Sequence, residues 1–171
     1  VNADIRIAHL TPLLCLLAAA TFRYRDRSLL AGAALGLAAG LKFLLWPLGV
    51  WLVATGRLRA AAMSLGIAAA TLLLVLPFAS LDEYVRTLRT VGAEFDQDSY
   101  TTYGLLTQLG VPSPTARTLT LAFGAALLLM TWQRRSFALS VATALALSPI
   151  VWFDFFALAA IPLAASRPRL S

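Results

Sequence analysis

Lys42 is the residue whose type and position most directly indicate chemistry. It lies near the middle of an almost unbroken apolar stretch that runs from Leu29 to Thr55. An ammonium at bilayer depth costs at least ~2.5 kcal/mol even on lenient insertion scales, so it needs a partner or a water-filled cavity. Lysine is also a compact point charge that suits phosphate. Lys42 is therefore a candidate for binding an anionic group such as a lipid phosphate. The alternatives are a structural pair with a carboxylate and snorkelling to the surface.

A second set of candidates lies in the aromatic and polar parts of the chain. Asp154 stands within the aromatic sequence VWFDFF, with Trp152 close by. A carboxylate there is costly unless it is solvated or paired, so it could orient a sugar hydroxyl, bind a metal, or be a counter-ion for Lys42 or an arginine. Arg86 and Arg89 are three residues apart in a segment with helical periodicity. They could clamp a phosphate, or simply face solvent and lipid headgroups.

The remaining polar residues form no recognisable catalytic set. Asp96 and Asp98 have the spacing of paired metal ligands, but no third ligand is near them in the sequence. His9 is the only histidine and Cys15 the only cysteine, which excludes an internal disulfide and a thiol metal cluster. No Ser/His/Asp set, P-loop, HExxH or paired CxxC motif occurs. The sequence therefore gives only a weak signal for a metal site and identifies no general base.

The composition is that of an integral membrane protein. Of the 171 residues, 60% are hydrophobic and 13% are charged, whereas a soluble domain has about 25% charged residues. The net charge of +6 does not indicate nucleic-acid binding, because the arginines occur in short clusters between apolar runs. Such clusters are typical topology signals. The chain begins with Val1 and shows no signal-peptide pattern, so we expect a single transmembrane domain over 1–171 that is part of a longer protein.

Five apolar runs predict the membrane helices, since about 20 helical residues span the hydrocarbon core. The fourth run is short for a crossing unless its helix begins near Ala116. The last run is interrupted by Ser148-Pro149, and a proline inside a helix removes a backbone hydrogen bond. We therefore expect two short crossings there, at 136–148 and 152–166. The runs are Ile5–Phe22, Leu29–Thr55, Ala60–Ala79, Leu119–Trp132 and Phe137–Ala165.

The second run can be one tilted helix or a hairpin of two short helices, and the positive-inside rule favours the hairpin. A single helix would place six arginines outside the cytoplasm. A hairpin that turns between Lys42 and Pro47 would place nine of the fourteen basic residues inside, accompanied by one acid, Asp26. Each half would have about 13 residues and a length of ~20 Å, so the tip need not leave the membrane. The nine arginines are Arg23, Arg25, Arg27, Arg57, Arg59, Arg134, Arg135, Arg167 and Arg169.

With the hairpin returning to the cytoplasm, the third apolar run crosses the membrane outward, which predicts that residues 80–116 form an extracytoplasmic loop. Within it, LDEYVRTLRTVGAEF has apolar residues three to four positions apart, which predicts an amphipathic helix on the outer membrane surface. It is followed by the polar and aromatic DQDSYTTYG and a proline-rich turn at VPSPT. On the hairpin, Gly32, Gly36 and Gly40 form two consecutive GxxxG steps. Packing within the bundle is the simplest role for such a glycine face.

Three stretches of the chain resemble the polytopic GT-C glycosyltransferases. AGAALGLAAGLKFLLWPLGVWLVATGRLRAA is similar to a segment of glycosyltransferase family 87, the polyprenyl-phosphate-mannose-dependent mannosyltransferases. ALALSPIVWFDFFALAAIPLA resembles that family's segment near the C-terminus, and the opening VNADIRIAHLTPLLCLLAAATFRYRDR resembles the preceding helix. Together they are spread over most of the length of this chain, which would correspond to only about the C-terminal half of a full-length member. In this comparison, Asp154 takes the position of a family histidine.

The resemblance implies sugar transfer on the outer face of the cell membrane by a multi-pass enzyme. The donor would be a sugar, mannose in this family, linked to a polyprenyl phosphate, and the acceptor a lipid or glycan hydroxyl. Lys42 matches the family lysine and would contact the lipid phosphate, with Arg86 and Arg89 as further phosphate contacts. Trp152 and Asp154 would line the substrate pocket. The family's catalytic acid belongs to a loop absent from this sequence, and the resemblance leaves a divalent cation open.

The fold class expected from these observations is all-α: a polytopic, partial GT-C-like helix bundle with a re-entrant hairpin and an outer amphipathic helix. Two other functions remain open at this point. A broken hairpin with a buried charge also marks transporter sites, so a transporter or channel subunit is the first alternative. A non-catalytic membrane scaffold is the second.

Overall fold

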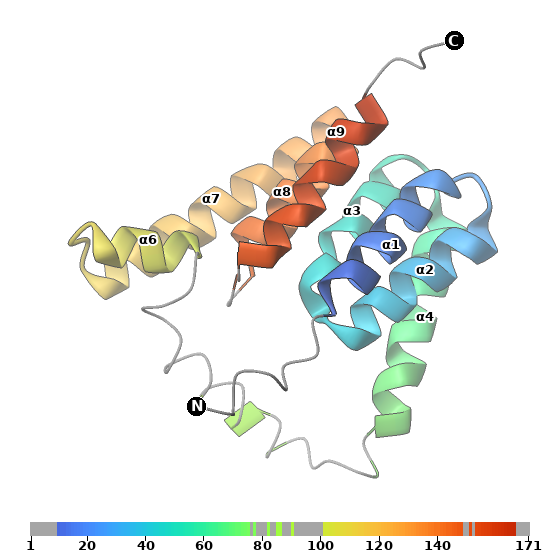
Figure 1. Cartoon of the computed structure of the whole chain (residues 1–171), viewed down its shortest axis with the longest axis horizontal. Coiled ribbons are helices and arrows are strands. Elements are labelled where there is room, and N and C mark those ends of the chain that lie inside the picture. The colour runs from blue at the N-terminus through green and yellow to red at the C-terminus, as the bar shows by residue number, and fades with distance from the viewer. Residues whose placement is uncertain are drawn as a thin grey trace.

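The computed structural model of the chain describes residues 10–75, 77, 82, 85–86, 90, 101–148, 151 and 153–166. Every regular element in these ranges is a helix, which confirms the all-α fold class (Figure 1). The elements are α1 (Thr11–Arg23), α2 (Ser28–Leu41), the 3-10 turn η1 (Phe43–Leu45), α3 (Pro47–Ala54), α4 (Leu58–Val75), α6 (Thr102–Gln108), α7 (Ser113–Arg134), α8 (Phe137–Ala146), the 3-10 helix η2 (Phe153–Ala159) and α9 (Ala160–Ser166).

The predicted hairpin is present as two helices that return to the same end of the molecule. The helical path breaks at Lys42, whose backbone is extended, and α3 restarts with Pro47 in its first turn. Proline suits that position because its missing N–H is not needed there. At the other end, Arg57 Nη2 lies 2.7 Å from Asp26 Oδ1, which brings the two flanks of the hairpin together. Its second half is shorter than expected, 8 residues in α3, because η1 takes part of the return path.

The glycine face of α2 packs directly against α4. A Cβ added to Gly32 would lie 2.6 Å from Met63 Cβ, and one added to Gly36 would lie 2.6 Å from Ile67 Cβ. Gly40 faces Thr71 in the same way, so the contacts advance together along both helices and α2 and α4 run parallel. The predicted packing role of the GxxxG steps is confirmed.

Three aromatic side chains join α1, α3 and α8 at one end of the bundle. The Phe22 ring lies 4.6 Å from the Phe137 ring and 6.1 Å from the Trp51 ring, between centroids. Trp51 is buried, and its indole Nε1 donates a hydrogen bond to the Arg135 carbonyl at 3.1 Å. Because the Arg57 guanidinium also lies 5.9 Å from the Trp51 ring centroid, this cluster gathers the arginine clusters of residues 23–27, 57–59 and 134–135 at one end. We call this the arginine end.

The C-terminal half follows the predicted organisation. The α7 helix begins at Ser113, three residues before the expected Ala116. The last apolar run divides into two parts as expected, but its second part is the 3-10 helix η2 followed by the 7-residue α9 rather than one α-helix over 152–166. α7 and α8 are antiparallel neighbours that share a buried hydrogen bond between Thr131 and Thr143 at 3.2 Å. Figure 1 shows that α6 lies against the first part of α7 at one extremity of the molecule.

Helix α6 was not predicted, since the sequence there was interpreted only as a polar segment before a turn. Its N-cap explains it: Thr101 Oγ1 accepts a hydrogen bond from the Gly104 N–H at 2.9 Å. Such a cap satisfies one of the donors that a helix start leaves unpaired. The predicted amphipathic helix lies mostly outside the described residues.

Two of the described helices, α4 and α7, are long and apolar enough to cross a membrane. The other apolar helices are shorter than the ~20 residues that a perpendicular crossing needs. A cluster of buried apolar side chains joins α1, α2, α3, α8 and η2. Packing against one another therefore holds these short helices in place.

Candidate functional site

Lys42 lies at the end of the bundle opposite the arginine end, in the break between α2 and η1. Its backbone adopts φ −153° and ψ 118°, which ends α2 and turns the chain toward α3. The Lys42 N–H still donates to the Ala38 carbonyl at 2.9 Å, so the last turn of α2 remains closed. The side chain is half-buried. The break therefore places an ammonium group at a helix end rather than in the middle of a continuous helix.

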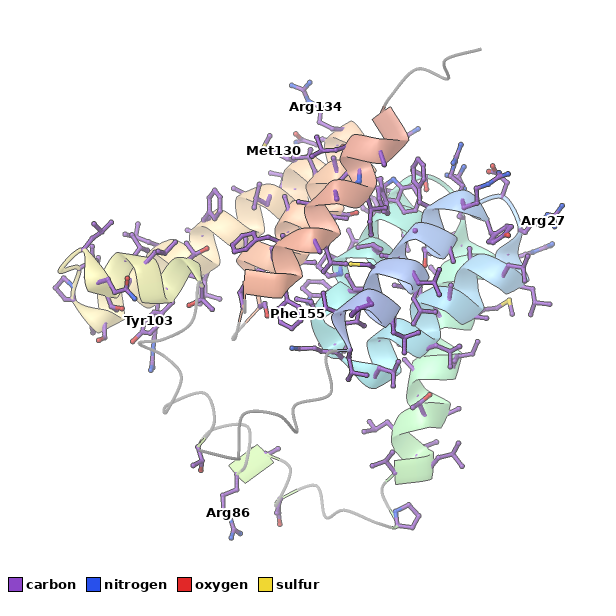
Figure 2. The ribbon with its side chains drawn as sticks, in the orientation of Figure 1. Arg27, Arg86, Tyr103, Met130, Arg134 and Phe155 are labelled. Carbon is purple, nitrogen blue, oxygen red and sulfur yellow. The ribbon has the colours of Figure 1, made fainter. Side chains whose placement is uncertain are left out.

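The Lys42 ammonium contacts an aromatic face from the C-terminal part of the chain. Its Nζ lies 3.8 Å from the centroid of the Phe155 ring, and Phe155 is only 4% exposed. A cation over an aromatic ring gains about 0.5–2 kcal/mol, with the larger values in desolvated sites. Figure 2 shows Phe155 at the end of the bundle away from Arg27 and Arg134. This contact explains how the apolar cluster accommodates a charge beside its buried residues.

The structure places Lys42 close to the segment that contains Asp154. Asp154 immediately precedes Phe155 in η2, so its backbone is one residue from the ring that Lys42 contacts. The side chain of Asp154 and the whole of Trp152 lie outside what the structure describes. Their role in a substrate pocket stays a prediction.

The structure does not show the two arginines proposed as phosphate contacts at the Lys42 site. Arg86 is exposed, and Figure 2 shows its side chain away from Phe155 and directed away from the bundle. Arg89 lies outside the described residues. The clamp formed by both arginines therefore also stays a prediction.

Sequence reasoning missed the aromatic partner of Lys42. The notable signal was the cluster of aromatic residues around Asp154, which could have suggested a cation–π contact as well as a carboxylate pair. A second aromatic pair flanks the lysine, because the rings of Phe43 and Trp46 stack at 6.3 Å and Phe43 is 70% exposed. Lys42 thus contacts a buried ring, and the residue that follows it in the chain, Phe43, is an exposed aromatic.

The arginine end has a different electrostatic character. Asp26 lies between Arg25, at 3.8 Å, and Arg57, at 2.7 Å. The hydrogen bond from Arg57 lowers the pKa of the Asp26 carboxyl below its ordinary value of 3.8, and the positive charges of Arg57 and Arg25 act in the same direction. Since the carboxylate is ionised at neutral pH, it links the two loops at this end through a charged hydrogen bond.

The described residues contain no group of three or more His, Cys, Asp or Glu side chains that could hold a metal ion. What the site around Lys42 can supply is a fixed positive charge beside aromatic surfaces. Such a charge stabilises an anion, and a phosphate is the anion that lysine commonly binds in proteins.

One comparison with known proteins identified a relationship. A family model described as glycosyltransferase family 87 matches residues 6–162, which is most of the chain and includes both Lys42 and Asp154. Comparison with curated proteins and with solved structures gave no match.

Proposed function

The chain belongs to glycosyltransferase family 87, and from this premise we propose that it takes part in moving a sugar from a polyprenyl-phosphate donor to an acceptor hydroxyl. The family is one of membrane glycosyltransferases, which favours the enzyme over the transporter and scaffold interpretations. Mannose is the sugar we propose, and a lipid or glycan outside the cytoplasm is the acceptor. The observation that carries the proposal is the placement of Lys42.

In the proposed arrangement, the protein crosses the cell membrane several times with the arginine end in the cytoplasm. The gathering of three arginine clusters at one end of the bundle supports this orientation, because positive residues accumulate on the cytoplasmic side. Lys42 and Phe155 then lie toward the extracytoplasmic face. The hairpin would enter the membrane without passing through it, which is compatible with its packing against α4 and the buried cluster.

The proposed reaction breaks the bond between the sugar's anomeric carbon and the donor phosphate oxygen. The acceptor hydroxyl loses its proton to a carboxylate base as its oxygen attacks that carbon. The bonding electrons leave with the polyprenyl phosphate, whose negative charge grows during the step. Lys42 would stabilise this charge from a position set before the reaction, and such preorganised charge is often the largest contribution to catalysis.

The other residues have supporting roles in this proposal. Asp154 and Trp152 would line the sugar pocket, and Arg86 and Arg89 would add phosphate contacts at the outer surface. We assign the general base to none of the residues in this sequence. The proposal holds for both metal-independent and metal-assisted transfer, in which a divalent cation would add its charge to that of Lys42.

Replacing Lys42 with methionine tests the proposal, because the variant keeps the length of the side chain and removes its charge. We expect the turnover of a polyprenyl-phosphate sugar to fall by about 10²–10³, the usual effect of removing one preorganised donor from an anionic transition state. Lys42→Arg should retain part of the activity. The measurement is sugar transfer by the membrane-embedded protein, together with donor binding.

The matched control is Arg59→Met, which removes an exposed positive charge at the arginine end. It should leave both transfer and donor binding close to wild type. The proposed role of Lys42 is refuted if Lys42→Met folds normally and leaves transfer and donor binding unchanged. Equal losses in both variants would indicate a general effect of charge on membrane insertion instead.

A further inference from the structure

A long apolar groove runs along the outside of α1, between this helix and the η2–α9 segment. This open groove has a volume of about 1100 Å³ and is lined on one side by α1 from Thr11 to Arg23. Small side chains form much of its wall, including Ala19 on α1 and Ala160 and Ala164 on α9. The volume is slightly above the ~300–1,000 Å³ that small-molecule sites occupy. The groove is therefore large enough for a sizeable apolar ligand.

The dimensions of the groove match one leaflet of a membrane. From Thr11 to Arg23 there are twelve helical steps, or about 18 Å at 1.5 Å per residue. Half of the hydrocarbon core is about 15 Å thick. The groove can thus receive an extended chain that reaches from one membrane surface to the middle of the bilayer.

The charge at the end of the groove indicates the kind of headgroup. Arg23 lines the groove at its arginine end and is exposed there. Phe22, which also lines it, carries the Arg25 guanidinium 4.7 Å above its ring. Within the described residues, the arginine end has seven arginines against one acid, Asp26. A negatively charged group at this point would be attracted by about 1 kcal/mol for each nearby basic residue, the usual value at a membrane surface.

We propose that the groove binds an anionic phospholipid, with an acyl chain along α1 and the phosphate headgroup at Arg23. This site is separate from the donor site proposed at Lys42, since the headgroup lies at the opposite end of the bundle. The inference does not depend on the sugar-transfer reaction. It depends on the apolar lining and on the positive charge that closes one end of it.

The only cysteine of the chain provides the probe. Cys15 is half-buried and lines the middle of the groove, so a bound acyl chain should shield its thiol. The experiment measures the rate at which a membrane-soluble maleimide labels Cys15 in nanodiscs of phosphatidylcholine, with and without added phosphatidylglycerol. We expect phosphatidylglycerol to slow labelling about fivefold, the ratio that one arginine–headgroup contact supports.

Two variants make the test specific. Arg23→Gln should remove the effect of phosphatidylglycerol, and Arg59→Gln should preserve it, because Arg59 is an exposed arginine at the same end that does not line the groove. Ala160→Phe should fill the groove and slow labelling in both lipid mixtures. Native mass spectrometry should show the same pattern, with phosphatidylglycerol retained by wild type and Arg59→Gln but lost from Arg23→Gln.

Several results would overturn the proposal. Equal labelling rates in the two lipid mixtures would show that the groove does not select an anionic headgroup. A phosphatidylglycerol effect that survives Arg23→Gln would place the headgroup elsewhere. Protection that increases with protein density at constant lipid composition would make a second copy of the chain the occupant. Protection by added polyprenyl phosphate alone would assign the groove to the donor, and Lys42→Met would then test whether both belong to one site.

Discussion

Replacing Gly36 with alanine tests the close packing of α2 against α4. The added Cβ would lie 2.6 Å from Ile67 Cβ and 2.9 Å from the Ser64 carbonyl oxygen. Carbon atoms attract each other best at about 3.5–4.0 Å, so the two helices must separate by about 1 Å. Because one of the opposing atoms belongs to the backbone of α4, no side-chain rotation relieves the contact. Overpacking of this kind costs about 1–3 kcal/mol.

The matched control is Gly66→Ala, which makes the same chemical change within α4. No atom lies within 4 Å of a Cβ added to Gly66. Both variants gain about 0.8–1.0 kcal/mol of helix stability, because alanine has a higher helix propensity than glycine. This gain cancels in the comparison, so the difference between the two variants reports the clash itself and should be about 1–3 kcal/mol.

The assay is unfolding of each variant in the same detergent, by heat or by added denaturing detergent, with circular dichroism as the signal. Gly66→Ala should be at least as stable as wild type, and Gly36→Ala should be clearly less stable than Gly66→Ala. Equal stability of the two variants would refute the reasoning. It would mean that α2 and α4 do not approach through the glycine face.

Two other predictions concern the arginine end. Trp51→Phe keeps an aromatic ring but removes the hydrogen bond to the Arg135 carbonyl, so it should cost about 0.5–1.5 kcal/mol of unfolding free energy; an unchanged unfolding transition would contradict this. The folded-state pKa of Asp26 is lowered, so its stabilising link to Arg57 is fully present above the ordinary value of 3.8 and is lost as the pH falls through the lower folded value. Asp26→Asn should therefore be less thermally stable than wild type at neutral pH, and the two proteins should become equally stable in acid. A difference that disappears already near neutral pH would show that another group controls it.

The break in the second apolar run could be predicted because its signals are local. Pro47 marks the restart of the helix, and the arginines on both flanks favour a return of the run to the end at which it began. The interruption at Ser148-Pro149 was predictable for the same reason. Helix α6 was not predicted, because its start depends on the side-chain cap that Thr101 forms and the surrounding composition suggests a loop.

The candidate site could be predicted only in part. A lysine in an apolar run can be recognised as a candidate from the sequence alone, since its charge is costly at any depth in the hydrocarbon. The ring that accepts this charge is far along the chain, and no local pattern selects Phe155 over the other aromatic residues near Asp154. Only the packing of η2 against α1 and α8 decides which of them meets the ammonium.

The sequence by itself predicted the membrane class, the two-helix return of the second run and Lys42 as the candidate for binding an anion. These follow from composition, proline and charge, whose effects extend over a few residues or across one membrane thickness. The tertiary structure decided that α2 and α4 run parallel through the glycine face, that Lys42 contacts Phe155, and that α1 and α9 enclose a groove ending at Arg23. Those features depend on which helix faces pack together, and apolar faces rich in alanine and leucine resemble one another too closely for the sequence to specify their partners.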